Sequence, residues 1–218
     1  MLNIKHGQAE ISEYIKSDIS DKTVKEALNS GKRLAALVAL GLKCIKTAAS
    51  VEYIHNGLLL LEDMQLDRVK RRGVETIHVK HGYATASKIS TYLIAKGLAG
   101  ASDEVHKHVS LMCLNLSLNL TEDTAPIRVK EERLNKWHGA GGIFSLAFMM
   151  STGPDTASIG ESLGVCYYLC MQKDKDNDKI DMFTENMRQV VTQLTLKHLW
   201  NPLIKEILNF IISRFKSS

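Results

Sequence analysis

Residues 51–67, which read VEYIHNGLLLLEDMQLD, constrain the fold more than any other stretch of this chain. The stretch holds no proline, and its apolar residues are dense enough to predict a helix that is buried on most sides. It also carries His55, Glu62, Asp63 and Asp67, although charged side chains are rarely buried unless they are paired or bind a metal ion. A core helix with acids near its end therefore indicates a functional site.

Helical rotation of about 100° per residue groups these polar side chains. His55 and Glu62 fall on one stripe, and Asp63 and Asp67, four residues apart, form a second rung beside it. Three carboxylates at the carboxyl end of a helix repel each other and meet the negative end of the helix dipole, so they need a cation or basic side chains. Basic residues follow at once along the chain, namely Arg68, Lys70, Arg71 and Arg72.

Two interpretations of this charge pattern stay open. In the first, the acids hold a hard divalent cation such as Mg²⁺ through oxygen, and the arginines bind the phosphate oxygens of a ligand. In the second, the pattern is a solvated helix end with ordinary ion pairs, because short charge runs usually lie on the surface.

The order of residues from 52 to 82 resembles the first aspartate-rich region of the trans-isoprenyl diphosphate synthases, also called polyprenyl synthetases. Glu52 and His55 match the E-x-x-H that opens this region, and the acids at 62–63 match the start of its D-D-x-x-D motif. Arg71-Arg72-Gly73 then matches its R-R-G at the same spacing. Upstream, residues 30–34, Ser-Gly-Lys-Arg-Leu, are similar to the start of the family segment G-G-K-R-x-R-P.

The resemblance implies an all-α isoprenoid (terpenoid) synthase fold. In such a fold a helical bundle surrounds a deep central cavity, with Mg²⁺-bound diphosphate at the mouth and the prenyl chain inside. The implied diphosphate contacts are Lys32, Arg33, His55, Arg71 and Arg72. The implied catalytic and metal-binding residues are Glu62, Asp63 and Asp67.

Several positions depart from the family pattern. The first acidic motif reads Glu-Asp-Met-Gln-Leu over 62–66, so its first acid is longer and its last acid is a leucine. Ala35-Ala36 stand in place of Arg-Pro, and residues 115–119 hold no carboxylate where the family has G-Q-x-x-D. Met171-Gln172 align with the second metal-binding aspartate pair, which is the most damaging loss.

These departures predict weak catalysis. Ionisation of an allylic diphosphate requires about three negative charges to be neutralised, and the family uses Mg²⁺ ions between two facing acidic clusters for this purpose. If each lost contact raises the barrier by a few kcal/mol, ordinary chain elongation by the chain alone becomes very slow. Binding of the diphosphate tolerates the same losses better.

Residues 174–185, DKDNDKIDMFTE, allow three interpretations. Their acids are spaced as in a calcium loop, but Lys179 replaces the glycine that the sharp turn of such a loop needs. Asn177, Asp181 and Glu185 follow the i, i+4, i+8 series of a metal motif in the class I terpene cyclases, which share the fold, and they are a candidate second metal site. The third interpretation is a solvated linker.

The composition indicates one ordinary domain over residues 1–218, with 44% hydrophobic and 24% charged residues. The net charge of +4 gives little reason to expect nucleic acid as a partner. No apolar stretch reaches the length of a transmembrane segment and no secretory signal opens the chain, so we expect a cytoplasmic protein. Cys166 and Cys170 are expected to be buried thiols, although they also resemble the C-x-x-x-C motif of plant geranyl diphosphate synthase small subunits.

Three functions stay open. The first is a divergent prenyltransferase that binds an allylic or isopentenyl diphosphate through Mg²⁺. The second is a catalytically inactive small subunit that forms a heterodimer with an active prenyl synthase, with a homodimer as the other expected assembly. The third is a terpene cyclase-like enzyme or a calcium-binding helical protein. If the chain is active, Gly57 and Leu58 predict an open cavity floor and long products, because short-chain family members carry aromatic residues there.

Overall fold

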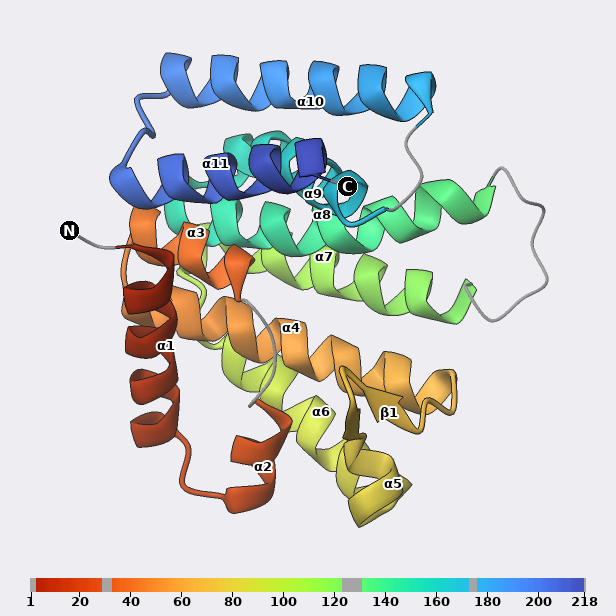
Figure 1. The fold of residues 1–218 in the computed structure, drawn as a ribbon. Coiled ribbons are helices and arrows are strands. Elements are labelled where there is room, and N and C mark those ends of the chain that lie inside the picture. The colour runs from red at the N-terminus through yellow and green to blue at the C-terminus, as the bar shows by residue number, and fades with distance from the viewer. Residues whose placement is uncertain (1–2, 29–32, 123–130, 173–175, 218) are drawn as a thin grey trace.

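The computed structural model of the protein is built almost entirely of α-helices, as the sequence predicted (Figure 1). It describes residues 3–28, 33–122, 131–172 and 176–217, and for Met112 and residues 114–122 and 131–140 it describes the backbone alone. The helices among these residues are α1 (Ile4–Asp18), α2 (Lys22–Ala27), α3 (Leu34–Leu42), α4 (Ile45–Gln65), α5 (Ile77–His81), α6 (Tyr83–Leu98), α7 (Asp103–Glu122), α8 (Glu131–Thr152), the 3₁₀ turn η1 (Pro154–Thr156), α9 (Ala157–Cys170), α10 (Asn177–Leu196) and α11 (Pro202–Ser217). Two short strands, β1 (Lys70–Arg71) and β2 (Val74–Glu75), form a hairpin.

The helices are arranged around α4 and α8, which pack against each other. Helix α4 also packs against α6, α3 and α7, whereas α8 packs against α9, α3 and α7. Helices α10 and α11 both pack on α9, so α9 lies between α8 and these two helices. In Figure 1 the hairpin lies at one end of α4, and α10 lies along the opposite edge of the molecule.

Helix α4 is the buried core helix that the sequence predicted, but it ends earlier than expected. It starts at Ile45 and ends at Gln65, and Leu66 closes it with a backbone hydrogen bond to the carbonyl of Glu62. Asp67 follows with a φ of 47°, outside the helix. The expected rung of Asp63 and Asp67 is therefore wrong, because the chain turns away before the second residue is reached.

The hairpin after α4 was not predicted. Lys70 pairs with Glu75, and Arg71 pairs with Val74. The two residues of the turn, Arg72 and Gly73, have φ values of 54° and 83°. A two-residue turn with positive φ at both positions matches the right-handed twist of a hairpin, and glycine accepts such a φ without steric cost. The R-R-G sequence thus builds the tip of this hairpin.

Residues 177–185 are the first part of α10. The Asp176 side chain accepts a hydrogen bond from the backbone N–H of Lys179 at 2.9 Å and so caps the helix. A continuous helix cannot form the turn of a calcium loop, nor is it a linker, so both of those interpretations are wrong for 177–185. Asp174 lies outside the described residues.

Small residues bring α4 and α6 into close contact. A Cβ added to Gly97 would lie 2.6 Å from the backbone oxygen of Ser50, and one added to Gly57 would lie 3.0 Å from the backbone oxygen of Ser90. The hydroxyl of Ser90 donates a hydrogen bond of 2.8 Å to the Gly57 carbonyl. Gly57 therefore faces α6 and not a cavity, which removes the basis for expecting an open cavity floor at this residue.

No helix among the described residues is both long enough and apolar enough to cross a membrane. The cysteines are free thiols, and Cys113, Cys166 and Cys170 are buried as expected, whereas Cys44 is exposed.

We predict that Gly97→Ala lowers the free energy of unfolding by about 1–3 kcal/mol, because the added methyl group must push two backbones apart. Urea unfolding measures the change. Gly7→Ala in α1 is the matched control, since its added Cβ meets only the flexible ends of leucine side chains and alanine favours a helix over glycine. Equal stability of the two variants would show that α4 and α6 are not in close contact.

Candidate functional site

The end of α4 and the hairpin carry a network of two acids and two arginines. Arg71 Nη2 lies 2.6 Å from Glu62 Oε2 and 2.8 Å from Asp63 Oδ1, and its Nε donates to both Asp63 oxygens at 2.8 and 3.0 Å. Arg68 Nη2 lies 3.1 Å from Glu62 Oε1, and its Nη1 lies 3.5 Å from Asp63 Oδ1. Each acid is thus bound by both guanidinium groups.

The backbone just after α4 fixes this network. The N–H of Arg68 donates to the carbonyl of Asp63 at 2.8 Å, and the hydroxyl of Thr76 donates to the carbonyl of Arg68 at 2.8 Å. These bonds fold the hairpin back over the helix end. Only 6% of the Asp63 side chain is exposed, and this burial raises the pKa of its carboxyl group although Arg71 acts in the opposite direction.

Asp67 does not join the other two acids. Its side chain is 83% exposed, and it accepts a hydrogen bond of 2.6 Å from the Tyr83 hydroxyl. Nε2 of the buried His78 lies 3.7 Å from Asp67 Oδ1. Asp67 thus belongs to a separate contact between the hairpin base and the start of α6.

Arg72, at the tip of the hairpin, is exposed and has no hydrogen bond or ion pair within the described part of the chain. Its charge nevertheless affects the pKa of one residue on α9 and of one on α4. Burial raises the pKa of Tyr167 on α9, and the charge of Arg72 opposes that rise. Burial, with the charges of Arg72 and Arg71, lowers the pKa of His55 on α4 to about 4. Arg72 therefore lies within electrostatic reach of α4 and of α9.

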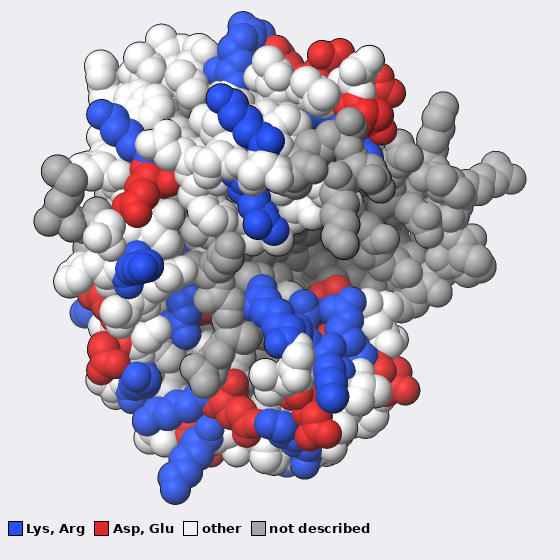
Figure 2. All heavy atoms as spheres, viewed as in Figure 1, with Lys and Arg blue, Asp and Glu red and all other residues white. Residues whose placement is uncertain are grey.

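The surface beside the hairpin is basic. Figure 2, drawn from the same side as Figure 1, shows lysine and arginine side chains gathered along one border of a hollow at the level of the hairpin. An exposed guanidinium next to a neutral imidazole suits an anionic ligand, because both groups can donate hydrogen bonds without a buried positive charge having to be created.

Arg33, an expected diphosphate contact, is turned into the core. Its Nη2 donates to the carbonyl of Leu28 at 2.8 Å, and its Nε lies 3.7 Å from Oε1 of Glu52. Asn56 donates to the same Glu52 oxygen at 3.0 Å. Arg33 is thus the counter-ion of a buried acid. Lys32, the residue before it, lies outside the described residues.

The structure places the candidate second metal site away from Glu62 and Asp63. Asn177, Asp181 and Glu185 are exposed on α10, whose buried side is formed by Phe183, Met187, Val190 and Leu194. Glu185 is also bound by Arg188, with contacts of 2.9 and 3.0 Å. In Figure 1 α10 and the hairpin lie on opposite sides of the molecule.

The described residues do not fit Mg²⁺ in this arrangement. The oxygens of Glu62 and Asp63 are bound by guanidinium groups, and Asp67 points elsewhere. The last two turns of α9, which lead into Met171-Gln172, hold no carboxylate that could act from the other side. Within the described parts of the chain, no three His, Cys, Asp or Glu side chains are placed to share a metal ion.

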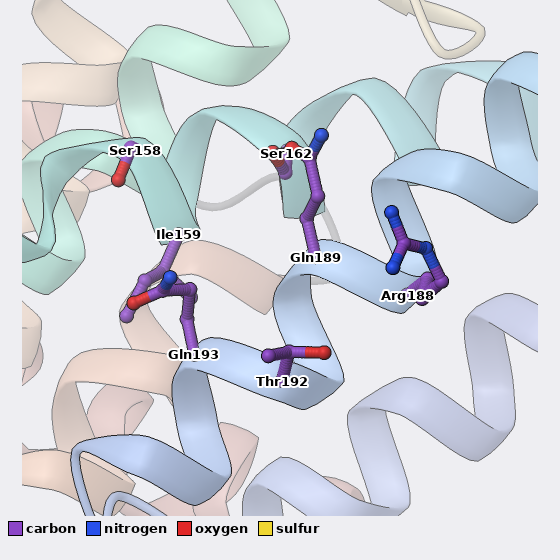
Figure 3. Close-up of a pocket in the computed structure, with 7 residues that line it drawn as sticks. All are labelled: Ser158, Ile159, Ser162, Arg188, Gln189, Thr192 and Gln193. Carbon is purple, nitrogen blue, oxygen red and sulfur yellow. Dashed lines mark hydrogen bonds between the residues drawn. The ribbon is translucent and has the colours of Figure 1, made fainter.

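Two cavities are lined by described residues. One of about 70 Å³ lies beside Asp63 and Arg71 and is also lined by Glu26 and Ala27 of α2. The other, of about 230 Å³, lies between α9 and α10 (Figure 3). Its lining is Ser158, Ile159, Ser162, Arg188, Gln189, Thr192 and Gln193, and the hydroxyl of Ser162 donates to Gln189 Oε1 at 3.2 Å.

Two residues of the site were not selected from the sequence. Arg68 was noted only as part of a basic run, although its position one residue after an expected acid is a signal for an ion pair. Tyr167 carries no sequence signal of its own, because only the packing of the bundle shows that Arg72 reaches α9.

Known proteins share this fold. A geranyltranstransferase from Thermotoga maritima superposes with a TM-score of 0.74 at 16% identity, over 96% of this chain and 96% of that chain. An isoprenoid synthase family member from Thermotoga neapolitana superposes with a TM-score of 0.75 at 16% identity, over 96% and 99%. The chain therefore has the isoprenoid synthase fold.

Distant sequence similarity points the same way. The chain is 33% identical over 107 residues to a geranylgeranyl diphosphate synthase from Saccharolobus solfataricus. This match covers 43% of the chain and 32% of that relative, so the chain aligns with about a third of the relative's length. No family model matches the sequence. The chain thus shares the fold of these solved structures and, over part of its length, is similar in sequence to a geranylgeranyl diphosphate synthase.

We predict a pH-dependent contribution of His55 to stability. Its pKa is about 4 in the folded protein against an ordinary value of 6.5, so between these values the unfolded chain binds the proton more readily. The free energy of unfolding therefore falls as the pH is lowered from 6.5 to 4, by up to about 3 kcal/mol from this group.

Urea unfolding of wild type and His55→Gln between pH 4 and 7 isolates this contribution from those of the buried acids. The difference between the two proteins should change over that range. His6→Gln, at an exposed histidine of α1, is the control and should follow the wild type. A constant difference between wild type and His55→Gln would contradict the prediction.

Proposed function

We propose that the chain binds a prenyl diphosphate between the end of α4 and α9 and does not elongate it alone. One observation carries this proposal: the exposed guanidinium of Arg72 lies within electrostatic reach of both helices, while the end of α9 offers tyrosines, a cysteine, Met171 and Gln172 in place of acids. The cationic half of a diphosphate site is thus present without its metal-binding counterpart.

The choice of a prenyl diphosphate rests on the fold and on the relatives. The chain shares its fold with a geranyltranstransferase and with an isoprenoid synthase family member, and its sequence relative is a geranylgeranyl diphosphate synthase. In this chain Arg71 and Arg72, with the neutral imidazole of His55, would bind the diphosphate. Because a guanidinium presents its N–H groups as a planar fork, it binds phosphate oxygens in pairs.

Slow chemistry follows from the acids that are missing. Departure of a diphosphate from an allylic carbon must be stabilised by cations held in place beforehand, and loss of one such contact commonly costs a factor of about 10²–10³ in rate. Mg²⁺ bound at Glu62 and Asp63, when present, would neutralise the leaving group, but those acids would first have to release Arg68 and Arg71.

A regulatory role fits a chain that binds the substrate and lacks half of the catalytic groups. We propose that it pairs with an active prenyl diphosphate synthase and alters the length of the product. A single domain over 1–218, a heterodimer rather than a homodimer, and a cytoplasmic location are parts of this proposal.

We predict that Arg72→Ala weakens binding of farnesyl diphosphate about tenfold or more, because the site loses its free guanidinium. Titration calorimetry or fluorescence with a labelled analogue measures the dissociation constant. Arg188→Ala is the matched control, because it removes an exposed arginine from α10 and should leave the affinity unchanged. Equal affinity of wild type and Arg72→Ala would place the ligand elsewhere.

Product analysis tests the catalytic half of the proposal. The purified chain with isopentenyl and allylic diphosphates and Mg²⁺ should give no elongated product, whereas its addition to an active synthase should shift that enzyme's product length. Turnover by the chain alone that disappears in Asp63→Ala would instead assign it as a prenyltransferase in its own right.

A further inference from the structure

The arginine best placed to bind phosphate is already occupied by carboxylates. Arg71 uses Nε and Nη2 on Asp63, and the same Nη2 lies 2.6 Å from Glu62. These are the fork positions with which a guanidinium would bind two phosphate oxygens. Arg68 completes the pairing from the other side of Glu62. The carboxylates of Glu62 and Asp63 thus occupy the guanidinium N–H groups that would otherwise bind phosphate oxygens.

We propose that Glu62 and Asp63 act as a built-in substitute for the ligand's anionic group, so that diphosphate binding is independent of metal and is restrained by these acids. A diphosphate displaces Glu62 from Arg71 and Arg68 and takes its place. This inference rests on the proposed function, because it concerns the same diphosphate site.

The two acids differ in how easily they can leave. The Asp63 side chain is 6% exposed, and separating a buried carboxylate from its cation leaves an uncompensated charge at high cost. The Glu62 side chain is 26% exposed and can turn into water, where an ion pair contributes little to stability. Glu62 is therefore the residue that exchanges, while Asp63 keeps Arg71 oriented.

Exposure of the arginines permits this exchange. The side chain of Arg71 is 19% exposed and that of Arg68 is 34% exposed, so a ligand in solvent can reach both guanidinium groups. Arg72 carries no internal partner among the described residues and supplies the first attraction for an anion. The positive charges freed at Arg68 and Arg71 then add to it.

A metal-ligand role for Glu62 and a competing role predict opposite changes in diphosphate affinity when Glu62 is removed. If the acid binds diphosphate through a cation, its removal weakens binding and the loss appears only when the metal is present. If the acid competes with the ligand, its removal strengthens binding and the gain appears without metal. The sign of one affinity change separates the two roles.

The test is calorimetric titration of inorganic pyrophosphate into the full chain in EDTA, with wild type, Glu62→Gln and Glu185→Gln. Glu62→Gln should bind about three- to tenfold more tightly than wild type, as expected when the two competing ion pairs of Glu62, with Arg68 and Arg71, are removed. Glu185→Gln removes an acid from a similar pair with Arg188 on α10, and changes the net charge equally, so it should match wild type. Repetition with Mg²⁺ in place of EDTA should not tighten binding by the wild type.

The possible results distinguish a failure of the proposed role of Glu62 from a failure of the proposed diphosphate site. If wild type binds pyrophosphate and Glu62→Gln binds it equally or more weakly in EDTA, the substitute role is overturned and the diphosphate site stands. If neither protein binds pyrophosphate or farnesyl diphosphate, the proposed function fails and the inference fails with it. If Glu62→Gln does not fold, Glu62→Ala replaces it in the same titration. Glu62→Ala should likewise bind pyrophosphate more tightly than wild type.

Discussion

The pairing of Glu62 and Asp63 with Arg68 and Arg71 is the interaction on which the site depends. It attaches the hairpin to the end of a buried helix, and it decides which positive charges remain available to a ligand. Without the arginines, two adjacent carboxylates at the negative end of a helix dipole would be unfavourable. With them, the acids are satisfied internally, and Arg72, which has no partner among the described residues, is left exposed within electrostatic reach of α9.

Much of the fold was predictable because apolar periodicity is a local property. The density of apolar residues in 51–67 identified the central helix. The end of α4 was not predictable, since Gln65, Leu66 and Asp67 show no helix-stopping glycine or proline. Asp67 takes a positive φ and accepts a hydrogen bond from Tyr83 at the start of α6, a contact that no helical pattern encodes.

The site was predicted less well than the fold, and for a clear reason. Sequence motifs indicate which residue types come close along the chain, but not which partner each side chain takes. Arg33 was expected at the diphosphate and instead lies against Glu52. The sequence left a calcium loop, a helical metal motif and a linker open for residues 174–185, and residues 177–185 form the start of α10. The family resemblance indicated which chemical groups occupy the site. The packing of the helices determined which of these side chains pair with each other.

Two neighbouring arginines have different tasks because of the backbone between them. Arg71 stands in a strand and is directed at the acids, whereas Arg72 occupies a left-handed turn position and extends outward. Their side chains are identical, so the hairpin register alone assigns one as the bound guanidinium and the other as the free one. Because Arg71 stands before the turn and Arg72 within it, the backbone conformation of the hairpin determines which guanidinium stays available to a ligand.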